Sequence, residues 1–590
     1  MTDLNRRCIP VQVIKWRFWL LFGIFSILSL ILLMRAFNLQ VWHPEILRQQ
    51  NDMRTLRLVA HESQRGLILD RHGEILAASV PLRSIWIDPK QIKQTQSLQQ
   101  LQRWKKVAHL LELNIDKLVS RIQANSDKRY IYLKRQVLPS TADEIKALNI
   151  QGVYFKSESK RFYPSGEVNA PLLGVTNIDD RGIEGLEKYF DDSLVTTPIQ
   201  QHVRKARDGQ VVEHLQVTQA GQQPHHIELS LDQRIQALAY LELKKAMKLH
   251  QATSGSVVVL DVQTGEILAM ANAPSYNPND PKQRQSYRMR NRAIADTYEP
   301  GSVIKPFVIL AGLEAGVILP MSKIDVSPGH LRVGHKLIKD YRNYGEIDLA
   351  TILKKSSNVG VTKVALSMPV QDLLSVYGAL GVGETSELRL LGEAAGQLDT
   401  RSRWSKLEHS TLSFGYGFTM TALQLTRMYA TLANHGVMMP LAITKQAHSQ
   451  APGRQVVSAK AADAVLSMLL NTTDIDGTAR QGHVEGYQVA GKTGTSRKAV
   501  AGGYGDDYVV SFAGVAPYNN PQVAIGVVIN DPKGDHYYGG DVAAPVFAKV
   551  MTGVLQLLNV PQSHYQKNAI QPFSLGNSAN QQLKKLVTLN

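Results

Sequence analysis

The chain has 590 residues, of which 44% are hydrophobic and 20% charged, a composition typical of folded globular proteins. This length exceeds one ordinary hydrophobic core, so about two to four units are expected. The formal net charge is +16, but the charges are scattered and no long basic run with interleaved aromatic residues occurs. A solvated basic surface is therefore expected, and a nucleic-acid-binding surface is not.

The first predicted element is the uncharged apolar segment Phe18–Met34. As a helix at about 1.5 Å per residue it would be about 26 Å long, which suits one membrane span with Arg35 and Trp42 at the far interface. A cleaved signal peptide is the alternative. However, the apolar run is longer than usual for one, and Met34–Phe37 lacks a small-x-small cleavage site. An uncleaved transmembrane helix is therefore predicted.

Positive charge before this segment predicts its orientation. Residues 1–17 are expected in the cytoplasm, 18–40 in the membrane and the remaining chain outside, because the preceding basic residues are Arg6, Arg7, Lys15 and Arg17. The only cysteine, Cys8, then lies on the cytoplasmic side. The exported part cannot form a disulfide and must be stabilised by burial.

Residues 41–225 are predicted to form a mixed α+β pedestal domain, and no catalytic motif is evident in them. In chain order, the patterns indicate two strands in 65–77, helix in 91–125, strands at 130–133 and 153–155, and a helix in 182–190. The polar segment Thr218–His226 marks the boundary. His225 and His226 would point to opposite faces of a strand, so linker polarity is favoured over metal binding.

Residues 226–560 predict a second domain with a central antiparallel sheet. A helical pattern at 231–250 precedes a hairpin at 256–261 and 266–271, and strand patterns return at 487–496, 508–516 and 522–530. About 200 residues of mostly helical pattern lie between these two groups of strands. A sheet assembled from both ends of the domain with an inserted helical block fits this order. The polar tail, 561–590, is predicted to be disordered.

Three motifs follow one another in this second domain: Ser302-Val-Ile-Lys305, Ser356-Ser-Asn358 and Lys492-Thr-Gly494. Each is weak alone, since Ser-x-x-Lys also occurs at Ser157–Lys160, in a charged stretch that should stay solvated. Their order and local setting are typical of serine acyl-transfer enzymes that recognise penicillin and D-Ala-D-Ala peptides.

Ser302 is the predicted nucleophile. It follows a Glu-Pro-Gly turn and opens a helical run, where a serine could also serve merely as the N-cap. A spacing of three places Lys305 on the same helix face, within reach of the Ser302 hydroxyl. A lysine is normally protonated near neutral pH, but burial and a second cation such as Lys492 would lower its pKa and allow it to act as the base.

Ser356 and Asn358 are predicted to lie in a loop between two helical stretches. The Ser356 hydroxyl could relay the proton from Lys305 to the leaving amine, and the Asn358 amide could fix the lysine or a substrate carbonyl. Taken alone, the pair would be interpreted as a polar helix cap.

The third motif is predicted to lie on a strand. Lys492 and Thr493 would then point to opposite faces, while Gly494 leaves space for another backbone. A peptide could add along this strand, with the N–H groups of Thr495 and Ser302 holding an oxyanion. The Lys492 ammonium and the hydroxyls of Thr493 and Thr495 would receive a terminal carboxylate.

With these residues the chain resembles class B penicillin-binding proteins of the division type. The resemblance extends from the anchor to about residue 560. The sequence Ser-Ser-Asn-Val-Gly at Ser356–Gly360, which has no Asp at its third position, resembles the division type more than the elongation type. Further segments carry the resemblance: Arg65–Asp70, Arg161–Glu167, Gly182–Gly185, Ser275–Asn279, Arg290–Ile294, Ser413–Gly417 and Tyr537–Gly540.

The resemblance implies a serine transpeptidase domain of the penicillin-binding and β-lactamase-like fold, acting on peptidoglycan stem peptides that end in D-Ala-D-Ala. Ser302 would form an acyl-enzyme that an amine of a neighbouring stem resolves, and β-lactams would acylate the same serine. No metal or organic cofactor is implied. The implied location is the bacterial inner membrane at the division septum, with the catalytic domain in the periplasm. The implied partners are an FtsW-type glycan polymerase and other divisome membrane proteins.

Three alternatives remain open. An elongation-type transpeptidase would use the same chemistry. A β-lactamase shares the motifs but has no need of an anchor and a pedestal, and no Glu-x-x-Leu-Asn occurs between Asn358 and Lys492. A non-catalytic β-lactam sensor or divisome scaffold is the third. A sensor would need a cytoplasmic output domain, for which residues 1–17 are too few.

Overall fold

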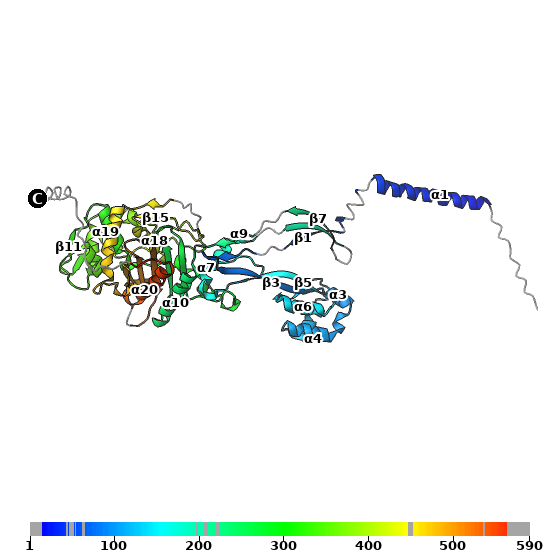
Figure 1. Cartoon of the computed structure of the whole chain (residues 1–590), viewed down its shortest axis with the longest axis horizontal. Helices are drawn as coiled ribbons and strands as arrows, with labels where there is room; N and C mark the ends of the chain where they lie inside the picture. Colours follow the sequence, from blue (N-terminus) through cyan, green and yellow to red (C-terminus); the bar gives the residue numbers. More distant parts are fainter. Residues whose placement is uncertain are drawn as a thin grey trace, which may run out of the picture. The chain divides into compact units, whose positions relative to one another are not determined.

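The computed structural model describes residues 15–42, 45, 52–53, 55–61, 65–195, 199–205, 211–219, 224–445, 452–534 and 537–562 (Figure 1). Two compact units are present. One comprises Met1–Gln64 with Thr196–Pro224, and the other Arg65–Val195 with His225–Asn590. Cys8, the basic residues Arg6 and Arg7, and all of the predicted disordered tail except 561–562 lie outside the described residues.

The first unit contains the predicted apolar helix. Helix α1 (Lys15–Phe37) continues into a π-turn, η1 (Asn38–Trp42), and Lys15–Trp42 is the one helix among the described residues that is long and apolar enough to cross a membrane. This confirms a helix over the predicted apolar segment and supports its role as a membrane anchor. The unit also has a three-stranded antiparallel sheet that the sequence patterns did not predict, in the order β1 (Leu56–His61), β6 (Ile199–Lys205) and β7 (Val211–Gln219).

The second unit begins with a sheet in the order β4-β3-β2-β8, with β5 paired to β3. Its strands are β2 (Ile68–Leu69), β3 (Ile75–Ile87), β4 (Ile131–Val137), β5 (Val153–Phe162) and β8 (Ile227–Glu228). The two strands predicted in 65–77 and the strands predicted at 130–133 and 153–155 are confirmed. β2 has only two residues, whereas β3, β4 and β5 extend beyond the predicted ranges. His226 Nδ1 accepts a hydrogen bond from Leu67 N at 3.0 Å, a polar backbone contact.

Helices cover one face of this sheet around the buried indole of Trp104. The helical stretch predicted at 91–125 is present but divided, because Asn114 caps a new helix with its side chain on Lys117 N. The helices are α3 (Pro89–Gln94), η2 (Ser97–Gln99), α4 (Leu101–Leu110), α5 (Ile115–Ala124) and α6 (Pro139–Ala147). The short elements that follow are η3 (Gly166–Val168), α7 (Ala170–Leu173), α8 (Gly185–Tyr189) and α9 (Asp191–Leu194).

Buried ion pairs fasten these short helices to the start of the unit. The fully buried Glu187 carboxylate accepts from Arg65 Nε at 2.8 Å and from Arg161 Nε at 2.6 Å, and Arg65 also reaches Asp191 at 2.5 Å. Removing one partner of such a cluster would leave an uncompensated buried charge. The helix predicted in 182–190 is α8, which carries Glu187.

The larger part of the second unit is built on a five-stranded antiparallel sheet in the order β10-β9-β19-β18-β17. The strands are β9 (Ser254–Asp261), β10 (Ile267–Ala273), β17 (Ala490–Val500), β18 (Gly503–Ala516) and β19 (Val523–Asn530). Strands from both ends of the domain thus form one sheet, as predicted, because β19 pairs directly with β9. β17 is an edge strand.

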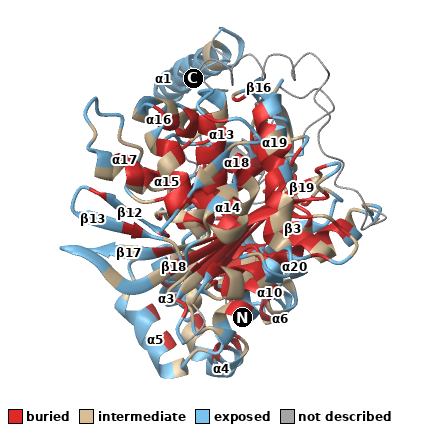
Figure 2. Ribbon diagram, turned by 90° about the vertical axis from the view of Figure 1, so that its left-hand side faces the viewer, coloured by how far each residue is buried: buried red, intermediate tan, exposed pale blue. Residues whose placement is uncertain are grey.

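Two helices pack on one face of this sheet and a helical block on the other. On the first face lie α10 (Gln233–Leu249) and α20 (Gly539–Leu557), packed on each other. The second face is covered by α18 (Ala422–Ala433), whose residues are all buried. Buried residues gather on the sheet and on the block around it (Figure 2). The prediction of an inserted helical block is confirmed.

The block contains α13 (Lys305–Glu314), α14 (Leu349–Lys355), α15 (Asn358–Leu366), α16 (Val370–Ala379), α17 (Lys406–Leu412) and α19 (Ala459–Leu469). Small two-stranded sheets, which were not predicted, pair β11 (Lys323–Asp325) with β14 (Glu346–Asp348), β12 (His330–Val333) with β13 (Lys336–Lys339), and β15 (Val437–Met438) with β16 (Arg454–Gln455). Short helices complete it: η4 (Pro281–Gln283), α11 (Ser286–Met289), α12 (Arg292–Ala295), η5 (Gly301–Ile304), η6 (Leu470–Thr473) and η7 (Arg480–Gly482).

Candidate active site

The Ser302 side chain is not used as a helix cap. Ser302 lies inside the 3₁₀ turn η5, which precedes α13, and its side chain makes no capping hydrogen bond. The N-cap interpretation is therefore wrong. The turn is instead held by backbone contacts, since Gly301 N donates to Gly415 O at 3.1 Å and Tyr429 Oη donates to Val303 O at 2.7 Å. Within the described ranges no hydrogen bond engages the hydroxyl of the half-buried Ser302, which is therefore available for chemistry.

Two glycines allow the Ser302 turn to lie against the edge strand β17. Gly301 has φ +64°, and a Cβ there would be 2.8 Å from Thr495 O. A Cβ on Gly494 would be 2.7 Å from Pro300 O and 2.3 Å from Ser511 Oγ. The space that Gly494 was predicted to leave for another backbone is thus occupied by Pro300 of the same chain.

Lys305 is fully buried, and its Nζ contacts the second motif. It lies 2.6 Å from Ser356 O, 3.1 Å from Ser356 Oγ and 2.7 Å from Asn358 Oδ1. In the described part of the chain none of its hydrogen bonds goes to Ser302. The structure therefore joins the first two motifs through Lys305 and Ser356, whereas the sequence pattern predicted a contact between Lys305 and Ser302.

Burial lowers the pKa of Lys305 well below its usual value, the positive charge of Lys492 lowers it further, and the charge of Asp340 opposes both. Burial also lowers the pKa of Lys492 to about 7. The two causes predicted for Lys305 are thus both present. A neutral amine at Lys305 can accept a proton near neutral pH.

Ser356 and Asn358 lie at the junction of α14 and α15, as predicted. Ser356 ends α14 in the left-handed conformation, with φ 56°, and Ser357 caps α15 through Gly360 N. This conformation directs Ser356 Oγ to 3.1 Å from Lys305 Nζ and 3.2 Å from Lys492 Nζ. One hydroxyl therefore bridges both lysines.

Asp340 supports this junction, and sequence reasoning missed it. Its carboxylate accepts from Ser357 Oγ at 2.5 Å, Asn358 N at 2.6 Å and Val359 N at 3.0 Å. A carboxylate at a helix N-terminus satisfies free N–H groups and complements the helix dipole. A lone aspartate in a polar loop gives no sequence signal for this contact, because the two segments meet only in the folded chain.

The strand β17 carries the third motif. Besides Ser356, Lys492 Nζ donates to Thr493 O at 3.2 Å and to Thr493 Oγ1 at 3.4 Å. Thr495 Oγ1 accepts from Gly539 N at 3.0 Å, so this hydroxyl also holds the start of α20. Gly494 and Thr495 lie beside the Ser302 turn, where they approach Pro300 and Gly301.

The free edge of β17 offers backbone groups to a ligand. Arg497 pairs with Tyr508 in β18, but its N–H points outward and donates to Tyr416 Oη at 3.3 Å. N–H groups two residues apart on a strand point the same way. Those of Thr495 and Thr493 therefore also point outward, the direction required for the predicted oxyanion donor and for an added peptide strand.

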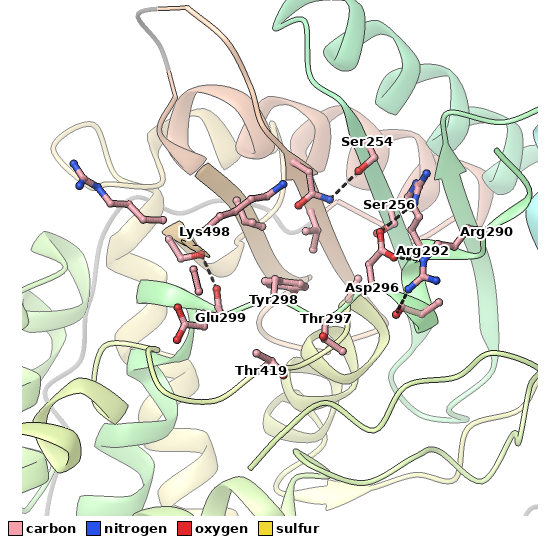
Figure 3. Close-up of a pocket in the computed structure, with 18 residues that line it drawn as sticks. Ser254, Ser256, Arg290, Arg292, Asp296, Thr297, Tyr298, Glu299, Thr419 and Lys498 are labelled. Atoms are coloured by element: carbon pink, nitrogen blue, oxygen red, sulfur yellow. Dashed lines mark hydrogen bonds and ion pairs between the residues drawn. The ribbon is translucent and has the colours of Figure 1, made fainter. Parts of the chain in front are cut away.

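A separate cavity of about 480 Å³ is lined by residues that include Tyr298, Glu299 and Lys498 (Figure 3). Among the residues that line the cavity, Arg290 and Arg292 both donate hydrogen bonds to the Asp296 carboxylate, and Ser496 Oγ donates to Glu299 O at 2.6 Å. Ser302, Lys305 and Ser356 do not line this cavity. The groups that converge on one another are those of the three motifs, and they form the candidate active site.

The chain matches two family models, the penicillin binding protein transpeptidase domain over residues 255–552 and the penicillin-binding protein dimerisation domain over 60–229. It is 44% identical to the peptidoglycan D,D-transpeptidase FtsI of Escherichia coli K12 over 93% of this chain and 92% of that protein. It is 40% identical to the probable peptidoglycan D,D-transpeptidase PenA of Neisseria gonorrhoeae over 91% of both chains.

Solved structures give the same assignment. A peptidoglycan synthetase of Bifidobacterium adolescentis superposes with a TM-score of 0.69 at 26% identity, over 87% of this chain and 99% of that one. Penicillin-binding protein 3 of Mycobacterium tuberculosis, complexed with aztreonam, gives 0.66 at 26% identity, over 86% and 98%. The two domain models, the sequence identities and the superpositions agree, and the chain therefore belongs to the penicillin-binding proteins, among the FtsI-type peptidoglycan D,D-transpeptidases.

Proposed function

We propose that the chain cross-links peptidoglycan stem peptides through an acyl-enzyme on Ser302. One observation carries this assignment. Lys305 Nζ, Ser356 Oγ and Lys492 Nζ form a continuous chain of contacts of 3.1 and 3.2 Å, and both lysines are fully buried. Lys305 directly follows the turn that carries Ser302. Such a chain can take a proton from a serine and return it to a leaving amine.

In the first half-reaction the Ser302 hydroxyl attacks the carbonyl of the penultimate D-Ala. The neutral Lys305 amine accepts the hydroxyl proton while the carbonyl oxygen becomes an oxyanion, which the N–H groups of Ser302 and Thr495 stabilise. The C–N bond then breaks. The last D-Ala leaves as an amine after Ser356 Oγ relays the proton to it from Lys305.

In the second half-reaction an amine of a neighbouring stem attacks the acyl carbon and gives its proton back along the same path, which regenerates the Ser302 hydroxyl. A β-lactam would acylate Ser302 in the same way. The Lys492 ammonium and the Thr493 hydroxyl lie 3.4 Å apart and together suit the substrate carboxylate. Because Thr495 Oγ1 already accepts from Gly539 N, it retains its own hydrogen to donate.

The apolar helix Lys15–Trp42 supports a single-pass membrane anchor. We place the N-terminus in the cytoplasm, the catalytic domain in the periplasm, and the protein at the division septum of the inner membrane, with an FtsW-type glycan polymerase and other divisome membrane proteins as partners. The similarity to FtsI supports this placement over the elongation-type alternative.

The test of the nucleophile is Ser302→Ala in the full-length protein. We expect loss of covalent penicillin labelling with an unchanged melting temperature, since only the attacking group is removed. Ser157→Ala is the matched control, because it removes the serine of the other Ser-x-x-Lys sequence and should leave labelling intact. Peptide mapping should place one stable adduct on Ser302. An adduct on another residue would refute the site, and rapid multiple turnover of penicillin would indicate a β-lactamase.

A further inference from the structure

The loop of residues 471–479 contacts both sides of the active site. Thr472 Oγ1 donates to Gly491 O at 2.6 Å, one residue before Lys492 in β17. At the other end of the loop, Thr478 N donates to Lys354 O at 3.3 Å, two residues before Ser356. Ala479 N closes the loop by donating to Thr472 O at 2.9 Å. The 471–479 loop therefore connects the strand of the third motif to the helix that ends at the second motif.

Asp476, in the middle of this loop, receives both of the lysines that end α14. Its Oδ1 lies 2.7 Å from Lys354 Nζ and its Oδ2 lies 2.8 Å from Lys355 Nζ, which also donates to Asp476 O at 2.8 Å. The hydrogen bonds from Lys354 and Lys355 lower the pKa of Asp476. The two lysine side chains are only 20% and 19% exposed. Their ends are therefore held in place.

The position of Asp476 follows from helix geometry. Adjacent residues of an α-helix point about 100° apart, so the side chains of Lys354 and Lys355 must converge to reach one carboxylate at the end of α14. Ser356, the next residue, adopts φ 56°, a conformation that is unfavourable for residues other than glycine and persists where the surroundings hold it. The contacts of Asp476 therefore lie at the helix end that immediately precedes this conformation.

We propose that Asp476 is a positioning residue for acylation. Acting through Lys354 and Lys355, it holds the Ser356 turn against β17 so that Ser356 Oγ reaches both Lys305 and Lys492. This role rests on the proposed function of those three residues. Asp476 itself is 61% exposed, and exposed ion pairs contribute little to the stability of a fold. Its removal should therefore change the rate of acylation more than the stability of the protein.

The test is Asp476→Ala in the detergent-solubilised full-length protein, with acylation by a chromogenic cephalosporin followed by stopped flow. We expect the acylation rate constant to fall about tenfold, while the dissociation constant of the initial complex changes less than about twofold. The melting temperature should remain within about 2 °C of wild type. Asp476→Glu, which keeps the carboxylate, should recover most of the rate.

Asp143→Ala is the matched control. Asp143 is 59% exposed and pairs with Arg83 at 3.1 Å in the pedestal, far from the three motifs in the sequence. Its replacement removes an ion pair of the same kind and should leave the acylation rate constant unchanged.

Salt gives a second measurement that does not depend on mutation. At about 1 M salt the screening length falls to about 3 Å, so the wild-type rate constant should fall toward that of Asp476→Ala, which should itself respond little.

The lysine partners give a further test. In the double variant Lys354→Met/Lys355→Met the acylation rate constant should fall by the same factor as in Asp476→Ala, and adding Asp476→Ala to it should cause no further loss.

An unchanged rate constant in Asp476→Ala would overturn the positioning role, as would an equal loss in Asp143→Ala or a rate that falls only in proportion to the folded fraction. None of these results would affect the nucleophile. Failure of the proposed function would be seen separately, as wild-type protein that penicillin does not label on Ser302.

Discussion

Two buried lysines share one serine hydroxyl in the active site, and this arrangement determines how each should titrate. Lys305 is the candidate base, and Lys492 is both a candidate ligand for the substrate carboxylate and a cause of the low pKa of Lys305. Because the pKa of Lys492 is about 7, its charge is partly lost in the physiological range. Base strength and carboxylate binding are therefore coupled through electrostatics.

Replacing Lys492 should move the pH profile of acylation in a defined direction. In Lys492→Gln a positive charge beside Lys305 is lost, so the pKa of Lys305 rises. The acidic limb of the acylation rate constant should then shift upward by about one pH unit. The dissociation constant for a carboxylate-bearing β-lactam should increase as well. Stopped-flow acylation across a pH series measures both, and a shift to lower pH would contradict the coupling.

Lys305→Ala should instead lower the acylation rate constant at every pH while leaving initial binding almost unchanged, because the lysine acts on the proton in the transition state. The matched control is Lys160→Ala, which alters the other Ser-x-x-Lys sequence and should acylate as wild type does. A Lys305 variant with the wild-type rate constant would exclude the lysine as the base.

At the level of elements, the sequence predicted much of the sheet and none of the contacts that place the serine. The strands β9, β10, β17, β18 and β19 were predicted because long runs of β-branched residues and short turns are local signals. The N-cap role of Ser302 was wrong because Gly301, through its positive φ and its bond to Gly415, sets a 3₁₀ turn there. Asp340 and Asp476 were missed because their partners are distant in sequence. The predicted site residues do gather in one place.

Because the Ser302 turn packs closely on β17, we expect Gly494→Ala to lower the acylation rate constant severely. The new methyl group would meet Pro300 O at 2.7 Å and Ser511 Oγ at 2.3 Å, so the turn must move. A displacement of about 1 Å can lower a catalytic rate about a hundredfold. In contrast, Gly378→Ala in α16 meets no atom within 4 Å and should raise the free energy of unfolding by about 0.4–1 kcal/mol. Acylation kinetics and thermal unfolding of both variants check this contrast.

For the molecule as a whole, the sequence predicted an anchor, an α+β pedestal and a transpeptidase domain. The apolar helix Lys15–Trp42 and the matches to both family models support that organisation. The three-stranded sheet β1-β6-β7 was not predicted, because β6 and β7 are rich in polar residues and β1 lies far from them in the sequence. The proposed boundaries at 40, 225 and 560 remain predictions.

The proposed septal role predicts where a fluorescent penicillin should label cells that carry this protein. Label dependent on Ser302 should concentrate at the septum, while a tagged Ser302→Ala chain should keep the septal position without the label. Fluorescence microscopy distinguishes the alternatives, since label spread along the lateral wall would indicate the elongation-type role.

The open edge of β17 has one more consequence. Unpaired strand edges are sites at which proteins aggregate, because any extended chain can pair with their free N–H and C=O groups. Here the edge is short. The Ser302 turn lies against it at Gly494 and Thr495, and Tyr416 Oη occupies the N–H of Arg497. The exposed pairing groups therefore suit a segment of only a few residues, so that a stem peptide can add to this strand while the long pairing required for fibril formation is blocked.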